Sequence, residues 1–206
     1  MRKLYEKHPE LAPLADKISR AAENIADAYR NGKKVLLCGN GGSAADCEHI
    51  CGELLKEFKI KRPVDRETRA KLEGAGAFDL AEKLAGGICA IPLPSLSGIF
   101  SAMCNDVGCE YAYAQMVYAM AEEGDVLLAF STSGNSVSVA NAAITARACG
   151  ATVIGFTGKG GGKLREHCDM LIDVPETETY LVQELHLPVY HEICALAEET
   201  LWGERK

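Results

Sequence analysis

Short, continuous apolar runs that alternate with helical stretches are the feature that most limits how this chain can fold. The segments 35–38 (VLLC) and 126–130 (VLLAF) contain no charged or hydroxyl side chain. Strands of this kind are buried on both faces, as in parallel sheets covered by helices. Similar strand candidates lie at 89–93, 152–156 and 170–174, with helical patterns between them and in 9–31 and 178–202. The alternation predicts an α/β protein with a parallel sheet between two layers of helices.

Composition and charge narrow the classes of protein to consider. The 206 residues carry a net charge of -7, which disfavours a nucleic-acid partner. Nine cysteines without a CxxC pair argue against a disulfide framework and for a cytoplasmic, reducing location. We expect no secretory leader and no membrane span, because the first residues lack an apolar core and no apolar run reaches 18 residues.

One segment interrupts the alternation. Residues 56–73 carry seven basic and four acidic side chains, and 74–87 hold a short helical pattern between glycines. We interpret about 56–87 as an insertion with one or two helices in a single domain that covers 1–206. The simpler interpretation of these charges is a solvated face. The more specific one is a lid over a site, or an edge that collects anions.

Two loops follow buried strands, where open parallel sheets bind their ligands. Residues 38–46 (CGNGGSAAD) place glycines before a helix N-terminus, which favours a sugar or phosphate, although a dinucleotide loop or a tight turn gives a similar pattern. Residues 131–136 (STSGNS) offer four hydroxyls where a helix N-cap needs one. This excess indicates an anion site built from hydroxyls and backbone N–H groups.

Two pairs of polar residues occur at helical spacing. His49 and Glu53 lie one turn apart and are possible ligands for zinc, but such a pair is also common on helix surfaces. Gln183 and His191 share one side of the last helix, in which Pro188 is expected to kink or loosen a turn. His186 is interpreted as a packing residue.

Taken in order, these motifs resemble a known family. GNGGSAAD, His49-x-x-x-Glu53, Asn105-Asp106, GDVLLAFSTSGNS, FTGKGGG and QExHxxxxH are similar to the sugar isomerase (SIS) domain, and within it to the phosphoheptose isomerase group. The resemblance implies a flavodoxin-like, three-layer α/β/α sandwich with a five-stranded parallel sheet. It also implies a homotetramer with sites at the subunit interfaces.

The resemblance further implies the roles of individual residues. It assigns a metal, expected to be zinc, to His49, Glu53, Gln183 and His191, and acid/base catalysis to Glu53 and His191. The implied substrate-binding residues are Asn40, Gly41, Gly42, Ser43, Asn105, Asp106, Ser131, Thr132, Ser133, Ser136 and Gln183. The implied reaction converts D-sedoheptulose 7-phosphate to D-glycero-D-manno-heptose 7-phosphate through an enediol.

This chain departs from the family pattern at two points. The connection between Glu57 and Cys89 is much longer than in the common form, and Pro188 lies inside the last helix. Two other hypotheses therefore accompany the isomerase: a non-catalytic SIS adaptor that binds a protein partner, and a phosphosugar sensor or an isomerase of another phosphosugar.

Overall fold

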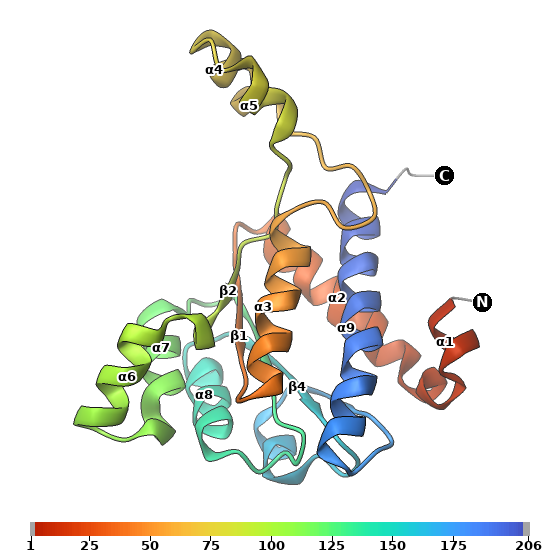
Figure 1. Ribbon diagram of the computed structural model, residues 1–206, viewed down its shortest axis with the longest axis vertical. Coiled ribbons are helices and arrows are strands. Elements are labelled where there is room, and N and C mark those ends of the chain that lie inside the picture. Colours follow the sequence, from red (N-terminus) through yellow and green to blue (C-terminus); the bar gives the residue numbers. More distant parts are fainter. Residues whose placement is uncertain (1–2, 204–206) are drawn as a thin grey trace.

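The computed structural model describes residues 3–203 and contains one parallel sheet (Figure 1). The strands run in the order β2-β1-β3-β4-β5. Their bounds are β1 Val35–Cys38, β2 Ala90–Pro92, β3 Val126–Phe130, β4 Thr152–Thr157 and β5 Met170–Asp173. The predicted five-stranded parallel α/β sandwich is confirmed. The chain order reverses between β1 and β3, so the loops that follow these two strands lie side by side.

Alternate strand residues face two separate apolar layers. Val35 and Leu37 belong to the cluster that also holds side chains of α2 (Ala15–Arg30), α3 (Gly42–Leu55) and α9 (Thr179–Trp202). Leu36 and Cys38 belong to the second cluster, with α7 (Ala112–Met120) and α8 (Val137–Ala148). Because successive side chains of a strand point to opposite faces, continuous apolar runs are what this double burial requires.

The remaining elements are short. The first predicted helix begins as the 3-10 helix η1 (Pro9–Leu14), in which Pro13 has no N–H to donate, and continues as α2. It is preceded by α1 (Lys3–Lys7). The other short segments are α6 (Ser97–Asp106) and the 3-10 helices η2 (Leu93–Ser95), η3 (Cys109–Tyr111) and η4 (Gly162–His167).

Two features of α6 and η3 differ from the sequence-based expectations. Asn105 and Asp106 form the last turn of α6 instead of a connection after it. Cys104 and Cys109 are joined as a disulfide, which the cysteine pattern did not indicate, although it argued only against a disulfide framework. This bond links residues that are neighbours in the chain, so it is a local crosslink around Asn105 and Asp106 and no framework for the fold.

The predicted insertion forms an arm. Its helices α4 (Arg66–Gly74) and α5 (Phe78–Lys83) project away from the sheet, beyond the end of α3 (Figure 1). Each side chain of α4 is at least partly exposed, and Phe78 on α5 is 64% exposed. Most side chains of the arm are thus exposed within one chain, whereas Arg62 of the same charged stretch is buried, and the arm does not cover the ends of the strands as a lid would.

At the base of the arm, Arg62, which follows α3, forms a buried ion pair with Glu198 of α9. Arg62 and Glu198 are both 0% exposed, and the Arg62 Nε donates to Glu198 Oε1 at 2.7 Å. The same guanidinium donates to the carbonyls of Leu54 and Glu53 at 2.7 and 3.0 Å, so it caps the last turn of α3. It also lies 4.9 Å from the ring centroid of Trp202.

The carboxylate of Glu198 is held by backbone donors as well. It accepts from the N–H groups of Phe58, Lys59 and Ile60 at 2.8 to 3.0 Å. Burial alone would raise the pKa of Glu198, but these N–H groups and the Arg62 guanidinium outweigh it and lower the pKa. Glu198 therefore stays ionised at neutral pH and fixes the turn between α3 and the arm.

No helix among residues 3–203 is long and apolar enough to cross a bilayer. The long helix α9 continues through Pro188 without ending there.

We expect Arg62→Met to lower the free energy of unfolding by about 3–5 kcal/mol, because it leaves Glu198 as a buried charge without its cation. Urea unfolding followed by circular dichroism measures this change. Arg69→Met is the matched control, since Arg69 meets Glu73 at 3.5 Å on the exposed arm and its loss should cost about 0.5 kcal/mol or less. Equal unfolding midpoints for the two variants would contradict the structural role of Arg62.

Candidate active site

The loops after β1 and β3 line a single pocket of about 430 Å³. Nine of the predicted substrate-binding residues lie here, together with Phe130, Asn135 and Thr179: Asn40, Gly41, Gly42, Ser43, Ser131, Thr132, Ser133, Ser136 and Gln183. Asn105 and Asp106 are not among the lining residues. They sit at the end of α6, where the Asn105 amide donates to Asp106 Oδ1 at 2.7 Å.

Hydrogen bonds hold the two loops against each other. The Asn40 amide donates to the hydroxyls of Ser136 and Ser138 at 2.9 and 3.0 Å. The Ser131 hydroxyl accepts from the backbone N–H of Ser136, the N-cap of α8, at 3.3 Å. The pocket therefore opens onto the N-terminus of α8, where free N–H groups and hydroxyls favour an anion without any basic side chain.

Glycine is needed at two points of this pocket. A Cβ on Gly42 would lie 2.6 Å from the Gln183 Nε2, so the amide of Gln183 rests directly on the glycine backbone. Gly134 has a φ of +68°, and a Cβ there would collide with the backbone of Gly161. The FTGKGGG loop thus packs against the STSGNS loop at a distance that only glycine allows.

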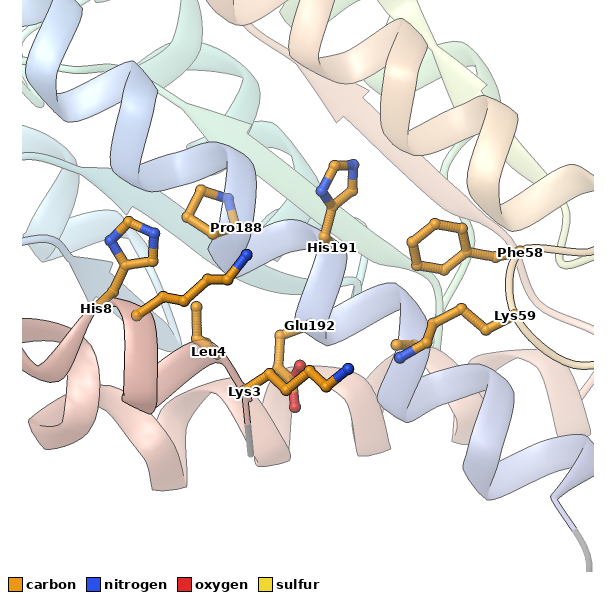
Figure 2. A pocket seen from close by; sticks show the side chains of 10 residues that line it. Lys3, Leu4, His8, Phe58, Lys59, Pro188, His191 and Glu192 are labelled. Carbon is orange, nitrogen blue, oxygen red and sulfur yellow. The ribbon is translucent and has the colours of Figure 1, made fainter. Parts of the chain in front are cut away.

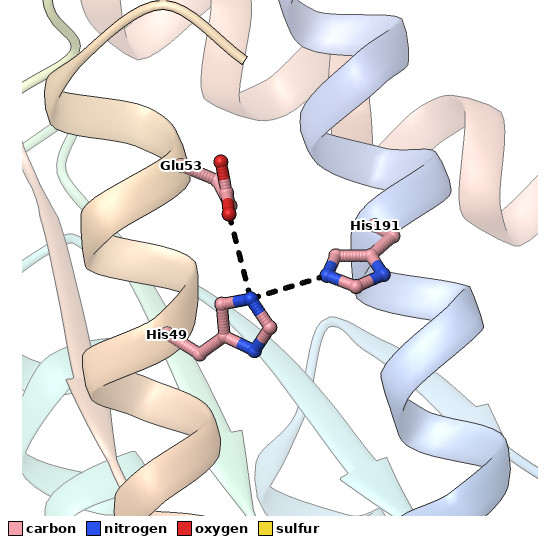
Figure 3. A group of neighbouring side chains, drawn as sticks. All are labelled: His49, Glu53 and His191. Atoms are coloured by element: carbon pink, nitrogen blue, oxygen red, sulfur yellow. Dashed lines mark hydrogen bonds and ion pairs between the residues drawn. The ribbon is translucent and has the colours of Figure 1, made fainter. Parts of the chain in front are cut away.

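Further along α3 and α9, these two helices bring three potential ligands together (Figure 3). His49 Nε2 lies 3.4 Å from Glu53 Oε1 and 3.3 Å from His191 Nε2. In a tetrahedral zinc site with bonds of about 2.0–2.1 Å, neighbouring ligand atoms are roughly 3.3–3.4 Å apart. The side chains of His49, Glu53 and His191 therefore fit a divalent cation in donor type, and the two distances from His49 match the spacing of such a site, with all three ligand atoms within 4.8 Å of one another.

The surroundings of these side chains set their protonation. Burial lowers the pKa of His191, and the neighbouring His49 lowers it further, although Glu53 acts in the opposite direction. His191 is thus a neutral imidazole at neutral pH, with one N–H and one free lone pair. The Glu53 side chain is only 14% exposed and also meets Lys56 Nζ at 3.4 Å.

A second pocket, of about 370 Å³, lies where α1, α9 and the segment after α3 meet (Figure 2). His191 and Pro188 line it from α9, and Lys3, Lys7 and Lys59 contribute ammonium groups. The imidazole of His191 thus borders a basic hollow as well as the cluster with His49 and Glu53.

The structure also tests the residues that sequence reasoning left as packing. His186 is buried edge-on against the stacked rings of Phe130 and Phe156, and its Nε2 lies 3.2 Å from the Thr157 carbonyl oxygen. Burial lowers its pKa to about 4, so it is a neutral core histidine, as predicted. Cys47 and Cys51 of α3 are buried thiols, and burial raises their pKa values, so they pack as apolar side chains.

Sequence reasoning missed four residues around the site. Arg62 caps the last turn of α3, which carries Glu53. The sequence showed Arg62 only as one residue of a basic stretch. Asn135 lines the pocket from within the STSGNS motif. Tyr190, one residue before His191, contacts His49, and its hydroxyl also donates to Asp46, three residues before His49. Helical spacing predicts that Asp46 lies on the same side of α3 as His49. Nothing in the sequence predicts its contact with Tyr190.

The fold and the two loops define a class of protein. Models of the SIS domain match residues 7–86 and 99–190, which together include the loops after β1 and β3 and most of the clustered ligands.

Individual relatives are more specific. The chain is 38% identical to a phosphoheptose isomerase of Burkholderia pseudomallei, with 94% of this chain and 89% of the relative covered, and 36% identical to one of Trichlorobacter lovleyi, with 93% and 86% covered. The solved phosphoheptose isomerase GmhA of Neisseria gonorrhoeae superimposes with a TM-score of 0.76 at 30% identity, covering 94% of this chain and 91% of that one. A phosphoheptose isomerase of Francisella tularensis gives 0.79 at 28% identity, with the same coverage. The chain belongs to the phosphoheptose isomerase family.

We expect Gly42→Ala to weaken phosphosugar binding by more than about tenfold, because the new methyl group must displace the Gln183 amide from the pocket. Isothermal titration with a phosphosugar measures the change. Gly52→Ala is the control, since a Cβ at Gly52 meets open space within α3 and should leave binding unchanged while stabilising the helix by about 0.5–1 kcal/mol. Equal affinities for the two variants would contradict the proposed contact.

Proposed function

We propose that this protein is an aldose–ketose isomerase that interconverts D-sedoheptulose 7-phosphate and D-glycero-D-manno-heptose 7-phosphate. The observation that carries the proposal is that α3 and α9 take part in two sites. Their N-terminal turns line the hydroxyl-rich pocket at the N-terminus of α8, and the Glu53–His191 pair lies further along the same two helices. The first suits a phosphate group, and the second supplies an acid and a base. The relatives named phosphoheptose isomerase support the choice of a heptose phosphate as the substrate.

The phosphate serves as a remote handle. Ser131, Thr132, Ser133 and Ser136 would hold it, and the binding energy would orient the reacting carbons toward Glu53. Asn40, Gly41, Gly42, Ser43 and Gln183 would contact the sugar. The ammonium groups of Lys3, Lys7 and Lys59 near His191 would attract an anionic substrate despite the net charge of -7.

Isomerisation moves one proton between two carbons and one between two oxygens. In the ketose-to-aldose direction, the Glu53 carboxylate takes a proton from C1, and the electron pair forms the C1–C2 double bond as O2 receives a proton from His191. His191 then takes the proton from O1, and Glu53 returns its proton to C2. A neutral His191 suits this exchange, because it has one proton to give and one lone pair to accept.

His49, Glu53, Gln183 and His191 would hold a zinc ion. When bound, the ion would polarise the substrate carbonyl and stabilise the negative charge of the enediolate. A carboxylate that binds the ion is a weaker base, so Glu53 would exchange between the two roles. The ligand spacing supports this proposal for three of the four residues, and Gln183 joins them by its place on α9 two turns before His191.

Assembly and location complete the proposal. Residues 1–206 would act as one SIS domain with the arm as an insertion, in a homotetramer with sites at its interfaces. Asn105 and Asp106, which lie outside the pocket of their own chain, would reach a site in this assembly. The cytoplasm would be the place of action, as expected from a cysteine pattern that lacks a CxxC pair. A non-catalytic adaptor is not favoured, because it has no use for the clustered ligands.

We expect Glu53→Gln and His191→Ala each to lower kcat for sedoheptulose 7-phosphate by about 10²- to 10⁴-fold, since each removes one proton-transfer group. Product formation followed by NMR and mass spectrometry measures the loss. Glu48→Gln is a matched control on the same helix, because Glu48 bonds Ser95 and takes no part in the cluster. Full turnover by either site variant would refute the mechanism.

We expect removal of divalent metal with a chelator to abolish turnover, and added zinc to restore it. The metal content of the protein, measured by inductively coupled plasma mass spectrometry, should follow the activity. A fully active, metal-free enzyme would exclude the metal from the mechanism and leave the acid/base proposal intact.

A further inference from the structure

A buried tyrosine connects the two helices behind His49. The Tyr190 hydroxyl lies 2.9 Å from His49 Nδ1 and 3.3 Å from Asp46 Oδ1, and the side chain is 1% exposed. We propose that Tyr190 and Asp46 are positioning residues that hold His49 in the tautomer with its proton on Nδ1. The inference rests on the proposed function for its purpose, because that tautomer prepares His49 to bind a cation.

The direction of the hydrogen bonds follows from counting protons. A tyrosine hydroxyl has one proton to donate, and an aspartate carboxylate only accepts. Among the described residues, the donor to Asp46 Oδ1 is the Tyr190 hydroxyl. The second carboxylate oxygen, Oδ2, is buried without a partner. If Tyr190 donated to His49 instead, the whole Asp46 carboxylate would be left without a donor, which is costly in a partly buried position. Tyr190 therefore donates to Asp46 and accepts from His49 Nδ1–H.

This arrangement leaves the His49 Nε2 with a free lone pair. Nε2 is the atom that faces Glu53 and His191 (Figure 3). Histidines that bind metals commonly donate their second ring N–H to an oxygen acceptor, which fixes the tautomer and orients the ring. Here the acceptor is a phenol oxygen whose own proton is held by a carboxylate.

The positioning residues oppose a competing interaction. Without a cation, the Glu53 carboxylate favours the other tautomer of His49, with the proton on Nε2 and directed at Glu53 Oε1 3.4 Å away. Such a proton would occupy the position that a cation needs. The contact to Tyr190, at 2.9 Å, suits a hydrogen bond in either direction, and the need of Asp46 for the Tyr190 proton makes it favour Nδ1–H. The site is thus prepared for a cation before one arrives.

The test reads the tautomer directly. We expect ¹H–¹⁵N long-range correlation spectra of the metal-free protein, at about pH 8.5 where histidines are neutral, to place the His49 proton on Nδ1. In Tyr190→Phe, which keeps the ring and loses the acceptor, the proton should move to Nε2. Zinc affinity, measured by competition with a chromophoric chelator, should fall about 10- to 100-fold.

Two further variants complete the experiment. Asp46→Asn keeps the volume but presents an amide that can donate to Tyr190, so it should also shift the tautomer and weaken zinc binding. Tyr113→Phe is the matched control: Tyr113 is another buried tyrosine, whose hydroxyl donates to the Gly39 carbonyl at 2.7 Å, and its loss should change neither readout. Thermal unfolding of each metal-free variant shows that the fold is kept.

The outcomes separate this inference from the proposed function. If the wild-type protein binds no zinc, the metal proposal fails, while the tautomer spectra still test the positioning residues. If Tyr190→Phe keeps the Nδ1 proton and binds zinc within about twofold of the wild type, the inference is overturned. Asp46→Asn supplies the same readouts if Tyr190→Phe does not fold.

Discussion

The buried pair of Arg62 and Glu198 is the interaction on which the rest of the site depends. One guanidinium binds the carboxylate on α9 and the last carbonyls of α3, including that of Glu53. The proposed base and the proposed shuttle, Glu53 and His191, stand on these two helices and meet only if the helices keep a fixed separation. A buried ion pair is a poor source of stability in comparison with apolar packing, but it is selective about geometry. Here that selectivity serves a cluster whose atoms must lie a few ångströms apart.

The sheet topology supplies the other half of the arrangement. Because β1 and β3 are neighbours and their connections depart to opposite faces, the two loops leave a gap at the carboxyl ends of the strands. The glycines of the first loop let the chain pass close to Gln183, and the hydroxyls of the second loop surround the N-terminus of α8. The proposed phosphate recognition would then rest on local dipoles, so it is compatible with an acidic chain.

Much of this architecture could be predicted from the sequence because it depends on local patterns of apolar and polar residues. The run VLLAF gave the bounds of β3, and the hydroxyl-rich loop after it lines the pocket. The missing parts depend on long-range contacts. Arg62 lies in a basic stretch that resembles a surface, and only the fold brings it to Glu198, 136 residues away. Tyr190 and Asp46 meet because α3 and α9 pack together, which no spacing along the chain reveals. The Cys104–Cys109 bond was missed because a count of cysteines carries no distance.

The distribution of the ligand cluster along the chain affects when the protein can begin to work. His49 and Glu53 stand on α3, which is synthesised well before α9 with His191 and Glu198. A nascent chain that has not yet reached α9 therefore carries only half of the proposed ligand cluster. Such a chain also lacks the carboxylate that anchors Arg62, so the end of α3 cannot take its final position until α9 has docked.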